Sequence, residues 1–165
     1  METTNILIPT DFSLASLNAV TALIKKQPEQ KFNIFLVHFL SLSDSISDLL
    51  MLSRRNREYQ HISSEFEQQV NAFRQCHPQN IIRIHYEFFY GNTVAVLKNY
   101  LEARDITTIA ALHDHTYLKL TKNSIDPTLL MQRSGCRLIN LAPVLTLQTE
   151  DDAITINNQE LQPSF

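Results

Sequence analysis

The chain has 165 residues, of which 44% are hydrophobic and 19% charged, a balance typical of one globular domain with a substantial core. Its formal net charge is −3. Nucleic-acid phosphates require a basic face, so we expect no nucleic-acid partner.

Targeting and redox signals are missing from the sequence. The longest apolar run near the start, residues 34–37, is far too short to cross a bilayer, and no positively charged region precedes an apolar one at the N-terminus. The two cysteines, Cys76 and Cys136, are far apart and form neither a disulfide framework nor a metal-ligand pattern. We therefore expect a cytoplasmic protein without a membrane segment.

The first structural signal is the run 6–13, Ile-Leu-Ile-Pro-Thr-Asp-Phe-Ser. Three consecutive aliphatic residues before Pro9 predict a strand that is buried on both faces and ends at the proline. Thr10, Asp11 and Ser13 then supply the short oxygen-bearing side chains that begin helices, and apolar residues at helical spacing follow from Leu14. This turn would lie at the carboxyl end of a parallel strand, where α/β folds bind ligands.

Strands and helices alternate along the rest of the chain. Further strands are predicted at 32–40, 81–88, 106–112 and 137–141. Helices are predicted over 59–76, after a cap at Thr93, and from Pro127 to a left-handed Gly135. The segment 81–88 alternates apolar and polar residues, which favours an edge strand.

This order predicts one α/β domain over residues 1–148, with a five-stranded parallel sheet covered by helices on both faces. Residues 149–165 are acidic and amide-rich, and we expect a loose tail in which 153–156 could pair as a short extra strand.

From about Asn5 to Leu141 the chain resembles the universal stress protein family. The resemblance rests on the run 6–13, the second strand ending at His38, the Tyr-Gly-Asn at 90–92, and the Cys-Arg-Leu-Ile at 136–139. It implies an adenine-nucleotide α-hydrolase-like, Rossmann-like three-layer sandwich and a homodimer. In one branch of the family it also implies ATP held at the switch point of the sheet.

The glycine signature of that ATP branch is absent. The family places two glycines three apart after the fourth strand, then a third glycine before a serine or threonine, because glycines let main-chain N–H groups approach phosphates. Residues 111–125 of this chain contain no glycine, and Asp114 would add negative charge beside a triphosphate. We therefore expect no ATP and no other cofactor, apart from the divalent metal considered below.

The candidate ligand site is the cleft at the ends of the first, second and fourth strands. Asp11 matches the aspartate with which the family contacts the nucleoside, but it could equally be a helix N-cap. The residues expected to line the cleft are Pro9, Thr10, Asp11, Val37, His38, His113, Asp114 and His115.

A divalent metal is a second hypothesis for the same place. Residues two apart in an extended segment share a face, so the imidazoles of His113 and His115 would point the same way, with Asp11 nearby. Two imidazoles and a carboxylate suit zinc. The alternative is a polar loop that happens to contain two histidines.

Three functions remain open on the sequence alone. The first is a non-enzymatic, universal-stress-like interaction module in stress adaptation, dimeric through the strand Arg137–Leu141, with an unknown protein partner. The second is a protein that binds a nucleoside or another small ligand near Asp11. The third is a metal-dependent enzyme that uses His113 and His115.

Overall fold

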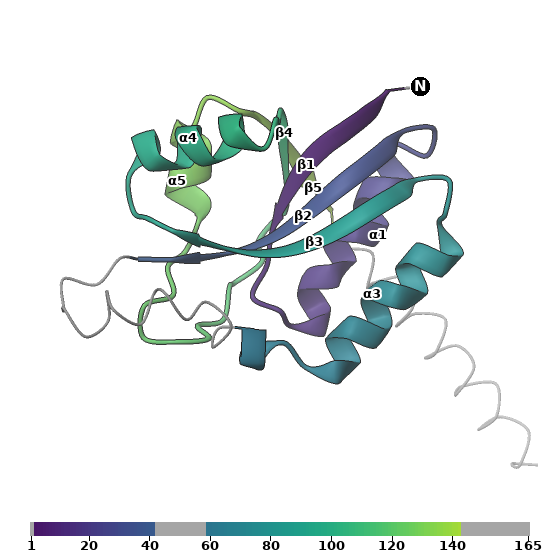
Figure 1. Cartoon of the computed structure of the whole chain (residues 1–165), viewed down its shortest axis with the longest axis horizontal. Coiled ribbons are helices and arrows are strands. Elements are labelled where there is room, and N and C mark those ends of the chain that lie inside the picture. The colour runs from purple at the N-terminus through teal and green to yellow at the C-terminus, as the bar shows by residue number, and fades with distance from the viewer. Residues whose placement is uncertain (1, 42–58, 143–165) are drawn as a thin grey trace, which may run out of the picture.

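A computed structural model describes residues 2–41 and 59–142. Its five strands are β1 (Thr3–Pro9), β2 (Lys31–Leu40), β3 (Ile81–Tyr90), β4 (Thr108–Leu112) and β5 (Arg137–Leu141). They form one all-parallel sheet in the order β3-β2-β1-β4-β5 (Figure 1). The predicted fold class is confirmed, and so is the edge position of the third strand.

The helices begin at polar caps. A 3₁₀ turn (Leu14–Leu17) begins at Ser13, whose hydroxyl accepts the N–H of Ser16, and continues into α1 (Asn18–Lys26). Ser63 and Thr93 cap α3 (Ser64–Cys76) and α4 (Val94–Ala103) in the same way. The short α5 (Thr128–Arg133) follows Pro127.

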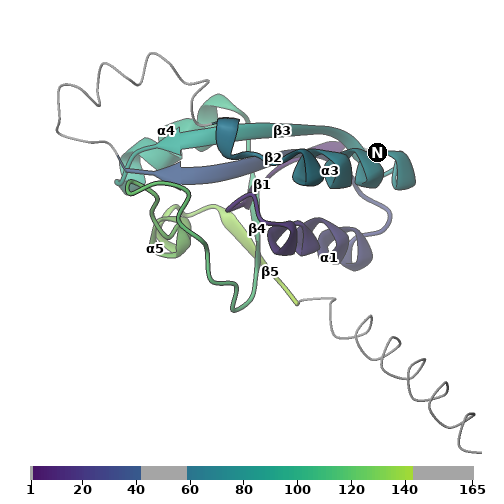
Figure 2. The same ribbon diagram turned by 90° about the horizontal axis from the view of Figure 1, so that it is seen from below.

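The sheet separates two apolar cores. In Figures 1 and 2, α1 and α3 cover one face and α4 and α5 the other. The first core includes Ile6, Ile8 and Phe66, and the second includes Leu7, Leu97 and Ile109. The alternation of Ile6, Leu7 and Ile8 between the two cores shows that β1 is buried on both faces, as its sequence predicts.

Several boundaries differ from the sequence prediction. The second strand begins one residue earlier, at Lys31, and the third strand ends two residues later, at Tyr90. The helix predicted over 59–76 begins only at Ser64, because Ser63 caps it and residues 59–61 form a separate 3₁₀ turn. The fourth strand begins at Thr108 rather than Ile106. The proposed short strand 153–156 lies outside the described residues.

The pairings of β1 with its two neighbouring strands differ in length. The β1–β2 register contains seven pairs, from Thr3↔Lys31 to Pro9↔Val37, whereas the β1–β4 register contains two, Ile6↔Thr108 and Leu7↔Ile109.

Across the described part of the chain, no helix is long and apolar enough to span a membrane.

Substitutions at Gly135 test whether the turn before β5 requires a left-handed backbone angle. Its φ is +77° and its missing Cβ would meet no atom within 4 Å, so Gly135→Ala adds strain without a clash. We expect Gly135→Ala to lower the free energy of unfolding by about 1–2 kcal/mol, and Gly135→Asn to cost less because asparagine tolerates left-handed angles. Urea unfolding of the three proteins measures this. Equal stability of the Ala and Asn variants would contradict the backbone explanation.

Candidate functional site

The candidate cleft is closed by the loop that joins β4 to α5, residues 113–127, here called the β4–α5 loop. It lies against the carboxyl ends of the neighbouring strands. Its backbone is tied to β2 by Ile125 N–H to Phe39 O (3.0 Å) and to β5 by His113 N–H to Leu141 O (2.8 Å). The loop is therefore an integral part of the sheet end.

Asp11 forms hydrogen bonds with both this loop and the turn after β1. Its side chain is 0% exposed. Oδ1 accepts the N–H of Ser13 at 3.0 Å and the Ser13 hydroxyl, while Oδ2 accepts the N–H of Leu118 at 2.9 Å and Nε2–H of His115 at 3.1 Å. The N-cap of the first helical turn is Ser13 rather than Asp11. Asp11 instead joins two segments that lie more than 100 residues apart.

Hydrogen bonds determine the charge state of Asp11. Burial alone would raise the pKa of its carboxyl group, but the bonds from Leu118, Ser13 and His115 outweigh burial and hold that pKa below its ordinary value of 3.8. Beside it, burial raises the pKa of the Tyr117 hydroxyl, and the carboxylates of Asp11 and Asp126 raise it further. The cleft therefore holds a carboxylate next to a neutral phenol.

His38 forms a second set of hydrogen bonds between the loop and the sheet. The Thr10 carbonyl can only accept, so His38 Nδ1 carries the hydrogen and donates it at 2.8 Å. Nε2 lies 2.7 Å from Ser124 Oγ, which also accepts the N–H groups of Leu120 and Thr121. The Ser124 hydroxyl hydrogen is consequently directed at Nε2. His38 is a buried, hydrogen-bonded core histidine.

The turn between Asp11 and Ser13 has a left-handed residue. Phe12 has φ +57°, which is uncommon for a residue with a large side chain. Its ring is buried and contacts the rings of Phe66 (5.4 Å between centroids) and Phe88 (5.4 Å). Aromatic packing thus holds the strained turn that aims the Asp11 carboxylate at the β4–α5 loop.

The structure brings together some of the predicted cleft residues and separates others. Thr10, Asp11, Val37, His38 and His115 converge, and Thr10 N–H donates to Val37 O at 2.9 Å. Pro9 lies beside Val37 in the register. His113 and Asp114 instead pair with each other at 3.2 Å, with side chains 68% and 86% exposed.

The predicted metal ligands do not form a common site. Asp114 has φ +61°, so residues 113–115 are not extended and the two imidazoles do not share a face. His115 contacts Asp11 whereas His113 contacts Asp114. Within residues 2–41 and 59–142, no group of three or more His, Cys, Asp or Glu side chains could hold a metal ion.

Sequence reasoning missed Leu118, Tyr117 and Ser124. Leu118 acts through its backbone N–H, which no side-chain pattern reveals. Ser124 could have been suspected, because a serine hydroxyl in a loop can bind main-chain N–H groups.

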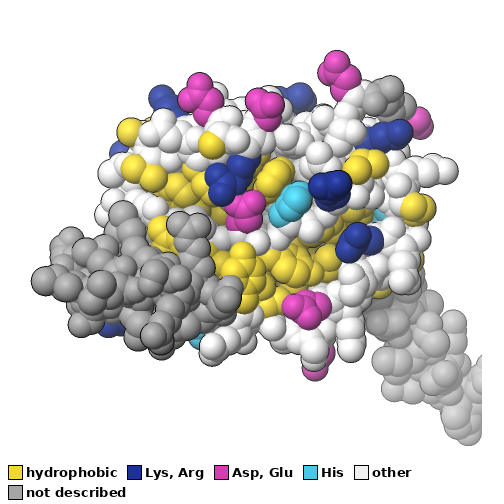
Figure 3. Space-filling view, viewed as in Figure 1, with side chains coloured by type: hydrophobic (Ala, Val, Ile, Leu, Met, Phe, Trp, Pro, Cys, Tyr) yellow, Lys and Arg dark blue, Asp and Glu magenta, His cyan; other side chains and the backbone are white. Residues whose placement is uncertain are grey.

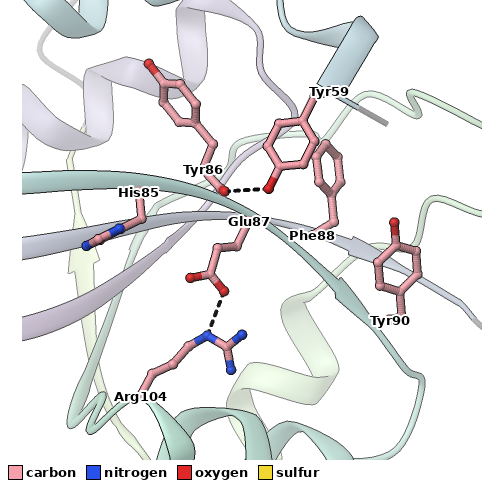
Figure 4. Close-up of a pocket in the computed structure, with 7 residues that line it drawn as sticks. All are labelled: Tyr59, His85, Tyr86, Glu87, Phe88, Tyr90 and Arg104. Carbon is pink, nitrogen blue, oxygen red and sulfur yellow. Dashed lines mark hydrogen bonds and ion pairs between the residues drawn. The ribbon is translucent and has the colours of Figure 1, made fainter. Parts of the chain in front are cut away.

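A separate groove of about 370 Å³ lies along the β3 edge (Figure 4). Its lining residues are Tyr59, His85, Tyr86, Glu87, Phe88, Tyr90 and Arg104. On one side, Arg104 Nε donates to Glu87 Oε1 at 2.6 Å and its guanidinium lies 3.8 Å above the Tyr100 ring. On the other side, the Tyr59 ring packs on Phe88 and its hydroxyl donates to Tyr86 O at 3.0 Å.

Asp11→Asn tests how much the hydrogen bonds of Asp11, which join the turn after β1 to the β4–α5 loop, contribute to stability. We expect the substitution to lower the free energy of unfolding by about 2–3 kcal/mol at pH 7, because bonds to a charged acceptor are lost or weakened. Since the native pKa lies below 3.8, the contribution of Asp11 is complete above that pH and disappears as the pH falls through the native pKa. Urea unfolding between pH 7 and pH 3 should show the two proteins converging.

Asp126→Asn is the matched control. Asp126 accepts the N–H and hydroxyl of Thr128 as Asp11 does those of Ser13, but it is exposed and has no contact to a distant segment. Its loss should cost about 0.5–1 kcal/mol. Equal losses in the two variants would mean that the contacts with Leu118 and His115 contribute nothing.

Comparison with known proteins supports the fold. No protein-family model matches the chain, and no curated protein matches it by sequence. Solved structures do match. The universal stress protein UspA from Lactobacillus plantarum is 19% identical with a TM-score of 0.54, covering 84% of this chain and 97% of that one.

Two further structures agree. A protein of the universal stress protein family from Burkholderia pseudomallei is 10% identical with a TM-score of 0.50, covering 84% of this chain and 95% of that one. The hypothetical protein MJ0577 is 16% identical with a TM-score of 0.53, covering 84% and 95%. These identities establish architecture rather than activity. The chain has the three-layer α/β fold of the universal stress proteins.

Proposed function

We propose that this protein is a universal-stress-like interaction module of the cytoplasm that does not bind ATP and has no enzymatic activity. One observation carries the proposal: the carboxylate expected to contact a nucleoside, Asp11, is fully buried and bound by its own chain. A nucleoside hydroxyl would have to displace the N–H of Leu118 or the imidazole of His115. The cleft residues serve to hold the β4–α5 loop in place.

The composition of the loop supports the same proposal. Residues 111–125 lack the glycines through which main-chain N–H groups approach phosphates, so Cβ atoms would occupy the space of the phosphate oxygens. The Ser124 hydroxyl binds the N–H groups of Leu120 and Thr121 and the imidazole of His38. An N–H group used inside the loop is no longer available to a ligand.

ATP titration tests the proposal. A charge-assisted hydrogen bond is worth about 1.5–3 kcal/mol, so the loss of two lowers the affinity by about two to four orders of magnitude. We expect calorimetry with ATP and Mg²⁺ to show no binding at submillimolar concentration. A micromolar Kd that Asp11→Asn abolishes would refute the proposal. Binding of adenosine without ATP would favour the alternative of a nucleoside-binding cleft.

We also propose that the protein acts as a homodimer through β5. This strand is a sheet edge, and its Leu138 is 40% exposed. An uncovered apolar edge favours association, and pairing of β5 with its copy about a two-fold axis covers it.

Light scattering tests the dimer. We expect twice the chain mass of 19.0 kDa at micromolar concentration, and the single-chain mass for Leu138→Glu, because pairing would bring two carboxylates into an apolar contact. Leu129→Glu is the control, since Leu129 is 63% exposed but lies on α5. A monomeric wild-type protein, or loss of the dimer in both variants, would contradict the assignment to β5.

A further inference from the structure

The strand β3 forms the other edge of the described sheet, and its backbone groups alternate between β2 and the outside. Gly91, directly after the strand, donates its N–H to Leu40 O at 2.8 Å, so the odd-numbered residues face β2. Tyr86 O accepts the Tyr59 hydroxyl at 3.0 Å rather than a β2 amide. The even-numbered residues therefore direct their N–H and C=O groups away from the sheet, as pairing with a further strand requires.

The side chains around these outward groups are largely apolar and incompletely covered. Ile84, Tyr86 and Phe88 pack against the core beneath α1 and α3 but are only partly buried. The groove of about 370 Å³ follows the same edge. Figure 3 shows hydrophobic side chains gathered along this face, with basic, acidic and histidine side chains among them. A ten-residue edge strand with such a surface is a template for pairing with another chain.

The side chain of Tyr59 occupies the place at which an added strand would pair. Its hydroxyl oxygen lies 3.0 Å from Tyr86 O, close to the distance of about 2.9 Å at which a ladder amide nitrogen would lie. Its ring packs edge-on against Phe88, with 5.0 Å between the centroids. Figure 4 shows the phenol beside the strand, with its hydroxyl directed at Tyr86. A strand added to β3 would have to displace this side chain.

The turn that carries Tyr59 is anchored to the fold. Tyr59 O accepts the N–H of Ile62 at 3.2 Å, and Ile62 packs against the first core. Ser63 then caps α3. Because the turn is short and held at its end, little further conformational entropy is lost when the phenol lies on β3.

The β3 edge is complementary to itself. In a two-fold, antiparallel pairing centred on Tyr86, the Tyr86 N–H of each chain donates to the Tyr86 carbonyl of the other. Ile84 then lies opposite Phe88 of the second copy, and His85 lies opposite Glu87. Apolar side chains meet apolar ones and a carboxylate meets an imidazole, without like charges directly opposed. The carbonyl at the centre of this pairing is the one that accepts the Tyr59 hydroxyl.

We propose that Tyr59 blocks the β3 edge against strand addition by a second copy of this chain. Its consequence for assembly rests on the β5 dimer proposed above. A subunit that paired through both β5 and β3 would contact two others, and the sheet would continue from copy to copy without closing. With β3 blocked, association ends at two chains.

Light scattering in the Leu138→Glu background, where pairing through β5 is removed, tests the block. We expect Leu138→Glu alone to keep the single-chain mass of 19.0 kDa and Tyr59→Ala/Leu138→Glu to reach twice that mass between micromolar and millimolar concentration. Tyr59→Phe removes only the hydroxyl and should associate at a higher concentration than Tyr59→Ala. It also decides the question if Tyr59→Ala does not fold. Leu129→Ala, which truncates an exposed side chain on α5, is the control and should not associate.

Amide hydrogen exchange measured by NMR locates the contact. We expect the outward amides of Ile84, Tyr86 and Phe88 to exchange about tenfold more slowly in the associated Tyr59 variant than in its Leu138→Glu parent, because each gains a partner or is covered. The inward amides of His85 and Glu87 already pair with β2 and should not change.

Three results would overturn the proposal. The first is a single-chain mass for both Tyr59 variants at every concentration. The second is equal association of the Leu129→Ala control, which would indicate a general effect of surface truncation. The third is association that leaves the outward β3 amides unprotected, which would place the contact elsewhere. A monomeric wild-type protein would refute the β5 dimer but not the block, because the Tyr59 comparison is made without β5 pairing.

Discussion

The buried carboxylate of Asp11 is the interaction on which the rest of this structure depends. A carboxylate without contact to water must have its oxygens satisfied by hydrogen bonds, and here the donors come from two segments of the chain. Satisfying one charge therefore fixes both the turn after β1 and the β4–α5 loop. The left-handed Phe12 belongs to the same arrangement, because its angle allows Asp11 and Ser13 to face each other.

The β4–α5 loop supplies hydrogen-bond partners at the carboxyl ends of the central strands. In a doubly wound sheet the carboxyl ends of the central strands leave a crevice, and polar groups there need partners. A bound nucleotide is one source of partners and a folded loop is another. In this chain Leu118, His115 and Ser124 supply hydrogen-bond partners for the polar groups at the strand ends.

The sequence allowed prediction of the five strands, their parallel pairing and the edge position of the third strand, because periodicity and short polar turns are local signals. It did not predict the partners of Asp11. Leu118 contributes a backbone N–H, and its position depends on the path of a loop without regular structure. The expected shared face of His113 and His115 is not observed for a similar reason: the left-handed angle of Asp114 is not visible in its residue type, and the two imidazoles have different partners.

The short pairing between β1 and β4 affects how the chain folds. β1, β2 and β3 are neighbours both in sequence and in the sheet, so their pairing closes shorter loops than the pairing of β1 with β4 does. The joint to β4 has two register pairs, and the Asp11–Leu118 bond beside it spans 107 positions. Loop-closure entropy must be overcome before these contacts stabilise the protein, which makes this joint the kinetically demanding element of the topology. The pairing of β4 with β1 and the contacts of the β4–α5 loop with Asp11 both join the two halves of the sheet at the same place.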